Sequence, residues 1–257
     1  MSIDLDIKDG IATIVINRPE RMNAMDAEHY KGLSQAWMRV RDDAAVRVAI
    51  ITGGGEKAFS AGADIKSFLT SPPAISDMWL TQQDQLLNRG LEVWKPVIAA
   101  VNGYCLAGGM TLLLATDIRV AATHATFGLA EVKRGIIPGN GGSQRILEQL
   151  PYPIAMEMIL TGEAIDAAAA ARHGLVNAVV PSSELMATAR EYAERIAANA
   201  PLAVQAAKEL AVRSREMDRT TGFRMEAIIN RLLQTTEDAK EGPAAFAEKR
   251  PPAFKGA

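Results

Sequence analysis

The chain has 257 residues, of which 48% are hydrophobic and 23% charged, and 28 basic against 30 acidic side chains leave a formal net charge of −2. This composition excludes a disordered or fibrous chain, and the small net charge excludes a global basic field that would hold nucleic acid or an anionic membrane. The single cysteine, Cys105, cannot form an internal disulfide. The start of the chain is acidic, unlike a signal peptide, and no apolar run reaches the roughly 18 residues of a membrane span. We therefore expect a globular, cytoplasmic protein.

The N-terminal part of the sequence alternates predicted strands and helices. Apolar and polar residues alternate over 3–7 and 11–16, which predicts a β-hairpin with its turn at 8–10. Asp26 is expected to cap a helix, because apolar residues recur every three or four positions after it. Residues 46–52 are expected to form a buried strand that ends at a run of glycines.

The alternation continues through the next part of the chain. Apolar periodicity predicts a helix over 75–93, ended by Lys95-Pro96, and buried strands over 97–101 and 118–121. A short apolar helix is expected between these strands, after Gly108-Gly109. This order of elements predicts a layered α/β fold.

From Ser143 onward the sequence is almost wholly helical, with one strand candidate at 175–180. Pro201 is suited to a first helical position and predicts a long helix toward Gly222. Gly242-Pro243 is expected to break the last helical segment.

Common catalytic signatures are absent from the sequence. It contains no Walker phosphate loop, no Gly-x-Gly-x-x-Gly after a strand and no Gly-x-Ser-x-Gly nucleophile elbow. His29, His124 and His173 lack the spacing of metal ligands, so we expect no metal site. Cys105 follows a predicted strand in apolar company and is expected to be a core residue.

Three segments rich in small residues each follow a predicted strand: 57–65, 102–111, and 127–131 with 135–142. Small residues let a ligand approach the backbone closely, and turns from strand to helix expose free N–H groups. A helix that begins near Gly109 directs its positive end toward Gly108, where an N–H group suits a developing oxyanion. The alternative for each segment is that its glycines serve tight turns and close packing.

Together these segments resemble the enoyl-CoA hydratase/isomerase family, also called the crotonase family. The strongest matches are Ala61-Gly62-Ala63-Asp64-Ile65, Lys95-Pro96-Val97-Ile98-Ala99-Ala100-Val101-Asn102-Gly103 and Ile137-Pro138-Gly139, and the resemblance runs from Asn17 to Arg250. It implies an α/β fold in which a spiral of ββα units is followed by a C-terminal helical region for trimerisation.

The resemblance also implies a division of the chain into two parts. An acyl-CoA-binding core is expected over 1–195 and a helical oligomerisation region over 196–257, in a homotrimer or a dimer of trimers. The change from α/β to helical composition, near Pro151 or Pro181, is the only boundary that composition by itself indicates.

The same resemblance implies the binding residues for an acyl-CoA thioester. By position in the motifs, Ala63 and Gly108 supply two backbone N–H groups that bind the thioester oxygen, where the charge of an enolate gathers. Contacts to CoA or the acyl chain are expected from Arg21, Met22, Ala24, Ala61, Asp64, Ile65, Gly109, Ile136 and Pro138, from Met78, Trp79 and Gln82 in the acyl pocket, and from Phe246 and Lys249 of a neighbouring subunit. For Arg21 and Lys249 the alternative is solvated surface charge. No separate cofactor is implied, since coenzyme A enters as part of the substrate.

The expected proton-transfer groups differ from the two glutamates of the family's hydratases. This sequence keeps the second, Glu131, and has Thr111 at the position of the first. A threonine hydroxyl can hold water, but its proton is too tightly bound for acid–base work near neutral pH. The alternative for Glu131 is a surface carboxylate paired with Lys133 or Arg134. The alternative for Thr111 is a passive packing role.

Several reactions therefore remain open within the family. Hydration or dehydration of a 2-enoyl-CoA through a thioester enolate is the leading hypothesis. Family isomerases that convert 3-enoyl-CoA to 2-enoyl-CoA use a single carboxylate, and hydratase-lyases acting on hydroxycinnamoyl-CoA pair a hydroxyl residue with a glutamate. A catalytically silent CoA- or RNA-binding protein is the remote alternative, disfavoured by the near-neutral charge.

Overall fold

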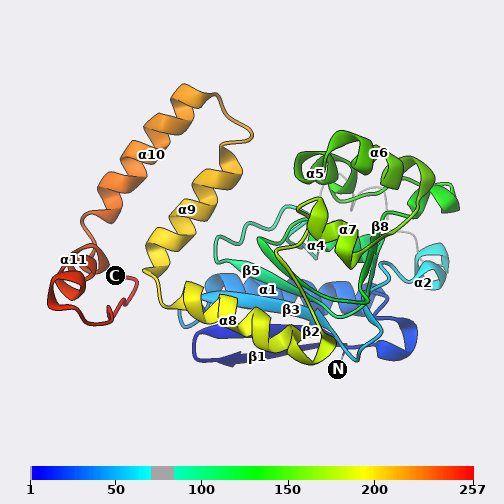
Figure 1. Ribbon diagram of the computed structural model, residues 1–257, viewed down its shortest axis with the longest axis horizontal. Helices are drawn as coiled ribbons and strands as arrows, with labels where there is room; N and C mark the ends of the chain where they lie inside the picture. Colours follow the sequence, from blue (N-terminus) through cyan, green and yellow to red (C-terminus); the bar gives the residue numbers. More distant parts are fainter. Residues whose placement is uncertain (1, 71–83) are drawn as a thin grey trace.

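Two β-sheets form the scaffold of the protein (Figure 1). The computed structural model describes residues 2–70 and 84–257, and the side chains of all of these except 68–70. The larger sheet has the order β1 (Ile3–Lys8), β2 (Ile11–Ile16), β3 (Val48–Gly53), β5 (Val97–Val101), β7 (Ile118–Ala122) and β10 (Ala178–Val180). The smaller has the order β4 (Ala58–Ser60), β6 (Tyr104–Leu106), β8 (Thr126–Gly128) and β9 (Ile165–Asp166). Neighbouring strands are parallel except β1 with β2 and β8 with β9.

The chain passes repeatedly from the larger sheet to the smaller. β3 leads into β4, β5 into β6 and β7 into β8. A helical segment follows each pair: α2 (Ile65–Thr70), α4 (Gly108–Leu113), and the 3-10 helix η2 (Glu131–Arg134) with α5 (Gly142–Gln149). The α/β fold built from ββα units is therefore confirmed.

The expected N-terminal elements are also confirmed. β1 and β2 form an antiparallel hairpin, and its turn residues Asp9 and Gly10 have φ of +54° and +76°, as a tight hairpin turn requires. α1 (Ala27–Asp42) begins where the Asp26 side chain accepts hydrogen bonds from the N–H groups of Glu28 and His29. A short 3-10 helix, η1 (Pro19–Arg21), joins β2 to this region.

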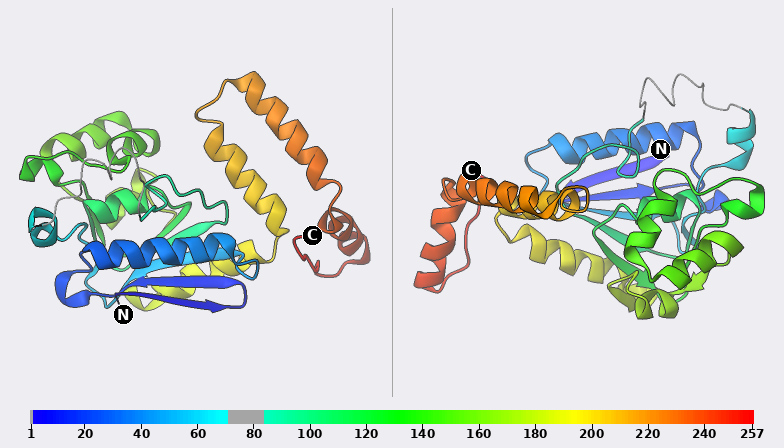
Figure 2. Two further views of the ribbon diagram at one scale, coloured as in Figure 1. Left: turned by 180° about the vertical axis from the view of Figure 1, so that it is seen from behind. Right: turned by 90° about the horizontal axis from the view of Figure 1, so that it is seen from above.

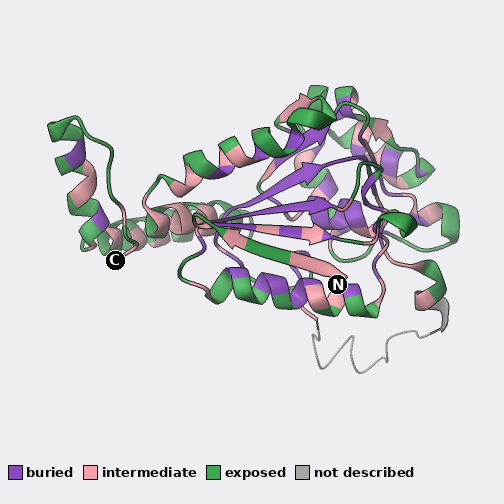
Figure 3. Ribbon diagram, turned by 90° about the horizontal axis from the view of Figure 1, so that it is seen from below, coloured by how far each residue is buried: buried purple, intermediate pink, exposed green. Residues whose placement is uncertain are grey.

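The central strands β3 and β5 of the larger sheet are buried on both faces, whereas the edge strand β1 is half-buried to exposed (Figure 3). Val48 and Ile50 of β3 pack with Leu185 on α8 (Leu185–Ala197), which covers one face after the short 3-10 helix η3 (Ser182–Glu184). The alternate residues of β3 belong to the main core with α1 and the smaller sheet. Cys105 lies in that core, as expected. Beside the smaller sheet, α6 (Tyr152–Thr161) packs on η2, and α7 (Ala167–Arg172) packs on β8 and β9.

The prediction of a helix over 75–93 is wrong for residues 84–93. Residues 71–83 lie outside the described residues. Residues 84–93 form turns, in which the Leu86 carbonyl accepts hydrogen bonds from the N–H groups of Arg89 and Leu91. Gly90 has a φ of +81°, a left-handed conformation that ends helical geometry. Leu86 and Leu91 are nevertheless buried, so the apolar spacing reflects anchoring of a loop.

The C-terminal helices differ from expectation in two places. The long helix predicted from Pro201 toward Gly222 is two helices, α9 (Pro201–Arg213) and α10 (Arg219–Leu233), because the Asp218 side chain caps a new helix by accepting from Thr221 N–H. α11 (Glu237–Glu248) continues through Gly242-Pro243. Buried Ala245 and an Arg250–Glu241 ion pair hold its last turns in place despite the missing proline N–H. Apolar periodicity predicts none of the strands β4, β6, β8 and β9 of the smaller sheet, because strands of two or three residues are too short to show it.

Helices α9, α10 and α11 stand away from the two sheets (Figure 2). The described side chains of α9 and α10 include none that is buried. The C-terminal tail returns to the scaffold, where the Arg47 guanidinium donates a 2.6 Å hydrogen bond to the Phe254 carbonyl. Among the described residues, no helix combines the length and apolarity needed to cross a membrane.

Candidate active site

The three segments rich in small residues converge at one edge of the smaller sheet. β4, β6 and β8 are parallel neighbours, so the segments that leave their carboxyl ends emerge side by side. Ala61–Asp64 follows β4, Ala107-Gly108 follows β6, and Glu131 follows β8. Such an edge is where open α/β sheets bind ligands.

Two of these segments touch through their glycines. A Cβ atom added to Gly62 would lie 2.6 Å from the Gly108 nitrogen, and one added to Gly108 would lie 3.3 Å from the Ala63 nitrogen. Gly62 also has a φ of +92°, which an L-residue adopts only with strain. The close approach of the two backbones therefore requires a glycine at 62 and leaves only a tight space for a Cβ atom at 108.

The N–H groups of Ala63 and Gly108 are the two expected oxyanion donors. Neither donates a hydrogen bond to another described residue, although their neighbours Ala61, Asp64 and Ala107 all do. Gly108 is the first residue of α4, and Ala107 before it has φ +48° and ψ −120°, an unusual conformation for a residue with a Cβ. The fold thus places two free N–H donors where the two segments meet.

Buried hydrogen bonds support this arrangement. Ala107 N–H donates to the Gly128 carbonyl at 2.9 Å, which joins the turn after β6 to the end of β8. Ser60 Oγ donates to the Asn23 carbonyl and accepts from Gly62 N–H. A Cβ on Gly109 would lie 2.3 Å from the Ser60 carbonyl oxygen, so Gly109 serves helix packing against β4.

The residues expected at the CoA moiety come together from two segments. Residues 22–25 run beside 61–64: Ala61 N–H donates to the Met22 carbonyl, and Asp64 N–H to the Met25 carbonyl. Arg21, Met22 and Ile65 are exposed at this junction, with Ala24 and Ala61 half-buried beside them. These five side chains therefore remain accessible to a ligand.

Asp64 has a structural partner in addition to its expected role. Its carboxylate accepts a 2.9 Å hydrogen bond from Arg18, which also pairs with Asp26 at 3.3 Å and donates to the Ala24 carbonyl. Although burial acts to raise the pKa of Asp64, this bond to Arg18 and backbone N–H groups hold it below its ordinary value. Arg18 and Asp64 thus fix the junction between the two segments.

Glu131 is a buried carboxylate, 9% exposed, at the start of η2. Burial raises the pKa of Glu131, with a smaller opposing effect from its own backbone N–H. Its Oε2 is buried without a hydrogen-bond partner among residues 2–70 and 84–257. Lys133 instead pairs with Glu163, and Arg134 donates to a backbone carbonyl, so the structure does not support a surface ion pair for Glu131.

Thr111 lies one turn into α4 and is 2% exposed. Its hydroxyl donates to the Gly108 carbonyl and accepts from Asn88 Nδ2, both at 3.1 Å. A Cβ added to Gly142 would lie 2.7 Å from the Thr111 methyl and 3.0 Å from Pro138. The structure therefore brings Pro138 and Thr111 together beside Gly108, whereas Ile136 is 54% exposed next to Glu131.

The remaining expected residues are not brought to this edge within one chain. Phe246, 87% exposed, and Lys249 lie at the end of α11, on the opposite side of the molecule from α2 (Figure 1). Met78, Trp79 and Gln82 lie outside the described residues.

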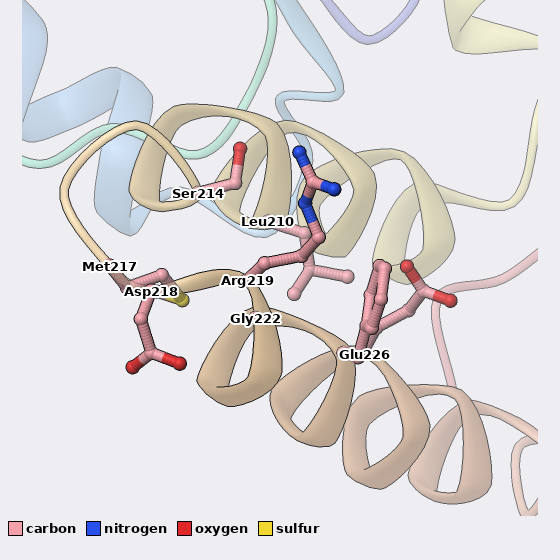
Figure 4. Close-up of a pocket in the computed structure, with 8 residues that line it drawn as sticks. Leu210, Ser214, Met217, Asp218, Arg219, Gly222 and Glu226 are labelled. Carbon is pink, nitrogen blue, oxygen red and sulfur yellow. The ribbon is translucent and has the colours of Figure 1, made fainter.

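Two cavities lie away from the convergence of the three segments. One of about 870 Å³ lies between α9 and the scaffold, beside Trp94 and Arg119. A second of about 420 Å³ lies between the end of α9 and the start of α10, against Met217 and Phe223 (Figure 4). None of the expected site residues lines either one.

Sequence reasoning missed three side chains that shape this site. Asn23 is completely buried and donates to the carbonyls of Gly54 and Ala58, and Arg18 pairs with Asp64. Asn88 contacts Thr111 from the loop after the undescribed segment. Asn23 and Arg18 stand at the start of the segment that resembles the family, which begins at Asn17, but no local signal marks Asn88, which lies 23 residues from its partner.

Comparison of the sequence with known proteins identifies relatives along its whole length. A model of the enoyl-CoA hydratase/isomerase family matches residues 6–257. The chain is 44% identical over 259 aligned positions to (E)-benzylidenesuccinyl-CoA hydratase of Thauera aromatica, with 100% of both chains covered. It is 43% identical to carnitinyl-CoA dehydratase of Salmonella enteritidis, covering 99% of this chain and 98% of the relative.

Solved structures show the same relationship. The fold matches the crystal structure of an enoyl-CoA hydratase from Mycobacterium tuberculosis with a TM-score of 0.91 and 41% identity, over 100% of this chain and 99% of the other. An enoyl-CoA hydratase from Bacillus anthracis matches with a TM-score of 0.92 and 37% identity, over 100% of both chains. With the fold, the converging segments and these similarities taken together, the chain belongs to the enoyl-CoA hydratase/isomerase family.

Proposed function

We propose that the protein adds water to the double bond of a 2-enoyl-CoA thioester and removes water in the reverse direction. The observation that carries this proposal is the pair of free N–H groups on Ala63 and Gly108, at the sheet edge from which buried Glu131 also emerges. Two relatives at 43–44% identity are named for water addition or removal on CoA thioesters, which favours this reaction over isomerisation.

In the proposed reaction, the thioester oxygen accepts hydrogen bonds from Ala63 and Gly108. Water adds its oxygen to the β-carbon while Glu131 takes one of its protons, and the electron pair of the double bond moves onto the thioester oxygen as an enolate. Glu131 then returns the proton to the α-carbon. The reaction uses no separate cofactor, because coenzyme A is part of the substrate.

The raised pKa of Glu131 suits this double role. A carboxylate whose pKa is raised toward the working pH is a stronger base than an ordinary glutamate, and its acid form is populated at a higher pH, from where it can return the proton. Because Thr111 cannot take a proton near neutral pH, Glu131 carries both transfers.

We also propose that the working enzyme is a homotrimer or a dimer of trimers. Phe223, Ile228 and Leu232 on α10 are 64%, 55% and 63% exposed, an apolar surface typical of an interface. Phe246 and Lys249 lie far from the site of their own chain, so they can contact CoA only at a neighbouring subunit.

The proposed reaction is tested with labelled water. Crotonyl-CoA and longer 2-enoyl-CoAs are offered in ¹⁸O-water, with 3-enoyl-CoAs in parallel. We expect label in a 3-hydroxyacyl-CoA product. Conversion of 3-enoyl-CoA to 2-enoyl-CoA, with no label incorporated from either substrate, would overturn hydration in favour of isomerisation. Aldehyde release from a hydroxycinnamoyl-CoA would instead indicate a hydratase-lyase.

A further inference from the structure

Asn88 and Thr111 form a buried hydrogen-bonded pair beside the proposed oxyanion site. Asn88 is 6% exposed and Thr111 is 2% exposed. The Thr111 hydroxyl donates a hydrogen bond to the Gly108 carbonyl oxygen with its only proton. It accepts a hydrogen bond from Asn88 Nδ2. The hydroxyl is therefore held in one orientation, and it has no proton left to donate to a ligand.

The other end of the Asn88 side chain has no partner. Asn88 Oδ1 is one of five buried side-chain polar atoms without a hydrogen-bond partner in the described part of the chain. A second is Oε2 of Glu131, the proposed proton-transfer residue. Leaving a buried acceptor unpaired is unfavourable, and both of these atoms are acceptors when Glu131 is ionised.

The position of Asn88 restricts what can pair with this oxygen. Thr111 holds the Asn88 amide nitrogen one turn beyond Gly108, whose N–H is a proposed donor to the thioester oxygen. A neutral carboxamide oxygen accepts a hydrogen bond without removing the donor's proton. The matching ligand group is therefore an O–H donor on the acyl chain close to the thioester.

We propose that Asn88 Oδ1 accepts a hydrogen bond from the oxygen at the acyl β-carbon, which is the water before addition and the 3-hydroxyl group after it. Thr111 is then a positioning residue that orients Asn88, rather than the water anchor itself. This inference rests on the proposed function, because only water addition places a hydroxyl group at that carbon.

The test compares ligands that differ by this hydroxyl group. Affinities for 3-hydroxybutyryl-CoA and butyryl-CoA are measured by calorimetry in the Glu131→Gln background, because the active enzyme would dehydrate 3-hydroxybutyryl-CoA to crotonyl-CoA, and kcat is measured without the Glu131 substitution. With Asn88 intact, we expect the protein to favour the hydroxyl ligand by about tenfold, the typical effect of one buried hydrogen bond. Asn88→Leu should abolish this preference, leave butyryl-CoA binding unchanged and lower kcat for crotonyl-CoA hydration by about tenfold.

Two further variants separate this role from a structural one. Asn88→Asp keeps an acceptor oxygen but buries a charge, so it should be less stable than Asn88→Leu while retaining the hydroxyl preference. Thr126→Val is the matched control, because Thr126 Oγ1 is also buried without a partner, at the opposite end of β8 from Glu131. It should leave kcat and the hydroxyl preference unchanged.

The outcomes are distinct. Retention of the hydroxyl preference in Asn88→Leu, or an equal loss of affinity for both ligands, overturns the role of Asn88. A wild-type protein that hydrates no 2-enoyl-CoA overturns the proposed function, and the binding comparison then still decides whether Asn88 recognises a hydroxyl group.

Discussion

Gly62 and Gly108 approach so closely that a Cβ atom on Gly62 would lie 2.6 Å from the Gly108 nitrogen. No side chain fits between them, and the N–H of Gly108 and that of neighbouring Ala63 remain free. This contact joins the segment after β4 to the segment after β6, and the proposed oxyanion site depends on it.

Gly62→Ala should therefore lower kcat by about 100-fold or more, because the methyl group displaces the Gly108 donor. Steady-state kinetics with a 2-enoyl-CoA measures this effect. Gly174→Ala is the matched control: Gly174 has a φ of +76°, but nothing lies within 4 Å of an added Cβ. The control should lose stability through backbone strain and keep its kcat. Equal kcat values for the two variants would remove the Gly62–Gly108 contact from the mechanism.

Glu131→Gln should abolish turnover, with a loss of at least about 100-fold, while acyl-CoA affinity stays nearly constant. The amide keeps the shape of the carboxyl group and removes its basicity. Glu163→Gln, which alters the exposed partner of Lys133, should retain wild-type kcat. Activity of Glu131→Gln within about tenfold of wild type would falsify the assignment.

The pH dependence of the free energy of unfolding should also reveal the raised pKa of Glu131. Burial raises its folded-state pKa above the ordinary value of 4.5, so the native state keeps this proton to higher pH than the unfolded chain does. The contribution of Glu131 to the free energy of unfolding therefore falls as pH rises from near 4.5 through the raised pKa. Relative to wild type, Glu131→Gln should gain stability over that interval and then reach a plateau.

Urea denaturation of both proteins from about pH 4 to pH 8 measures this difference. Taking the difference between the two proteins cancels the other titrating groups. A difference that stays constant with pH would contradict a raised pKa at Glu131.

Light scattering at micromolar concentration should find a trimer or a hexamer. Leu232→Glu places a charge within the exposed apolar surface of α10 and should shift the protein toward monomer. Lys31→Glu changes an exposed charge on α1 and should leave the assembly intact. A wild-type monomer would count against both the interface and the role expected of Lys249.

Lys249→Ala should raise KM for a 2-enoyl-CoA several-fold and leave kcat unchanged, because a lysine at the phosphates contributes binding in ground and transition states alike. The same acyl group on pantetheine, which lacks the nucleotide, should be insensitive to this substitution. Lys240→Ala, on α11, which ends one residue before Lys249, serves as the control, and Lys240 pairs with Glu237. An equal effect on both thioesters would indicate disturbance of α11 rather than loss of a phosphate contact.

Local residue patterns were sufficient for much of the fold, and the family resemblance supplied most residues of the candidate site. The β1–β2 hairpin, the Asp26-capped α1 and the buried strands β3, β5 and β7 follow from turn chemistry, capping and apolar periodicity. The family motifs located Ala63, Gly108 and Glu131, because each lies in a contiguous segment directly after a strand.

Tertiary contacts decided what periodicity could not. Residues 84–93 carry a helical spacing of leucines, yet buried Leu86 and Leu91 anchor a loop that turns at Gly90. Pro243 lies within α11, where tertiary contacts hold the helix together around it. Asn88 meets Thr111 across 23 residues of sequence. A contact of this kind depends on how the loop packs against α4, and no spacing rule within either segment encodes it.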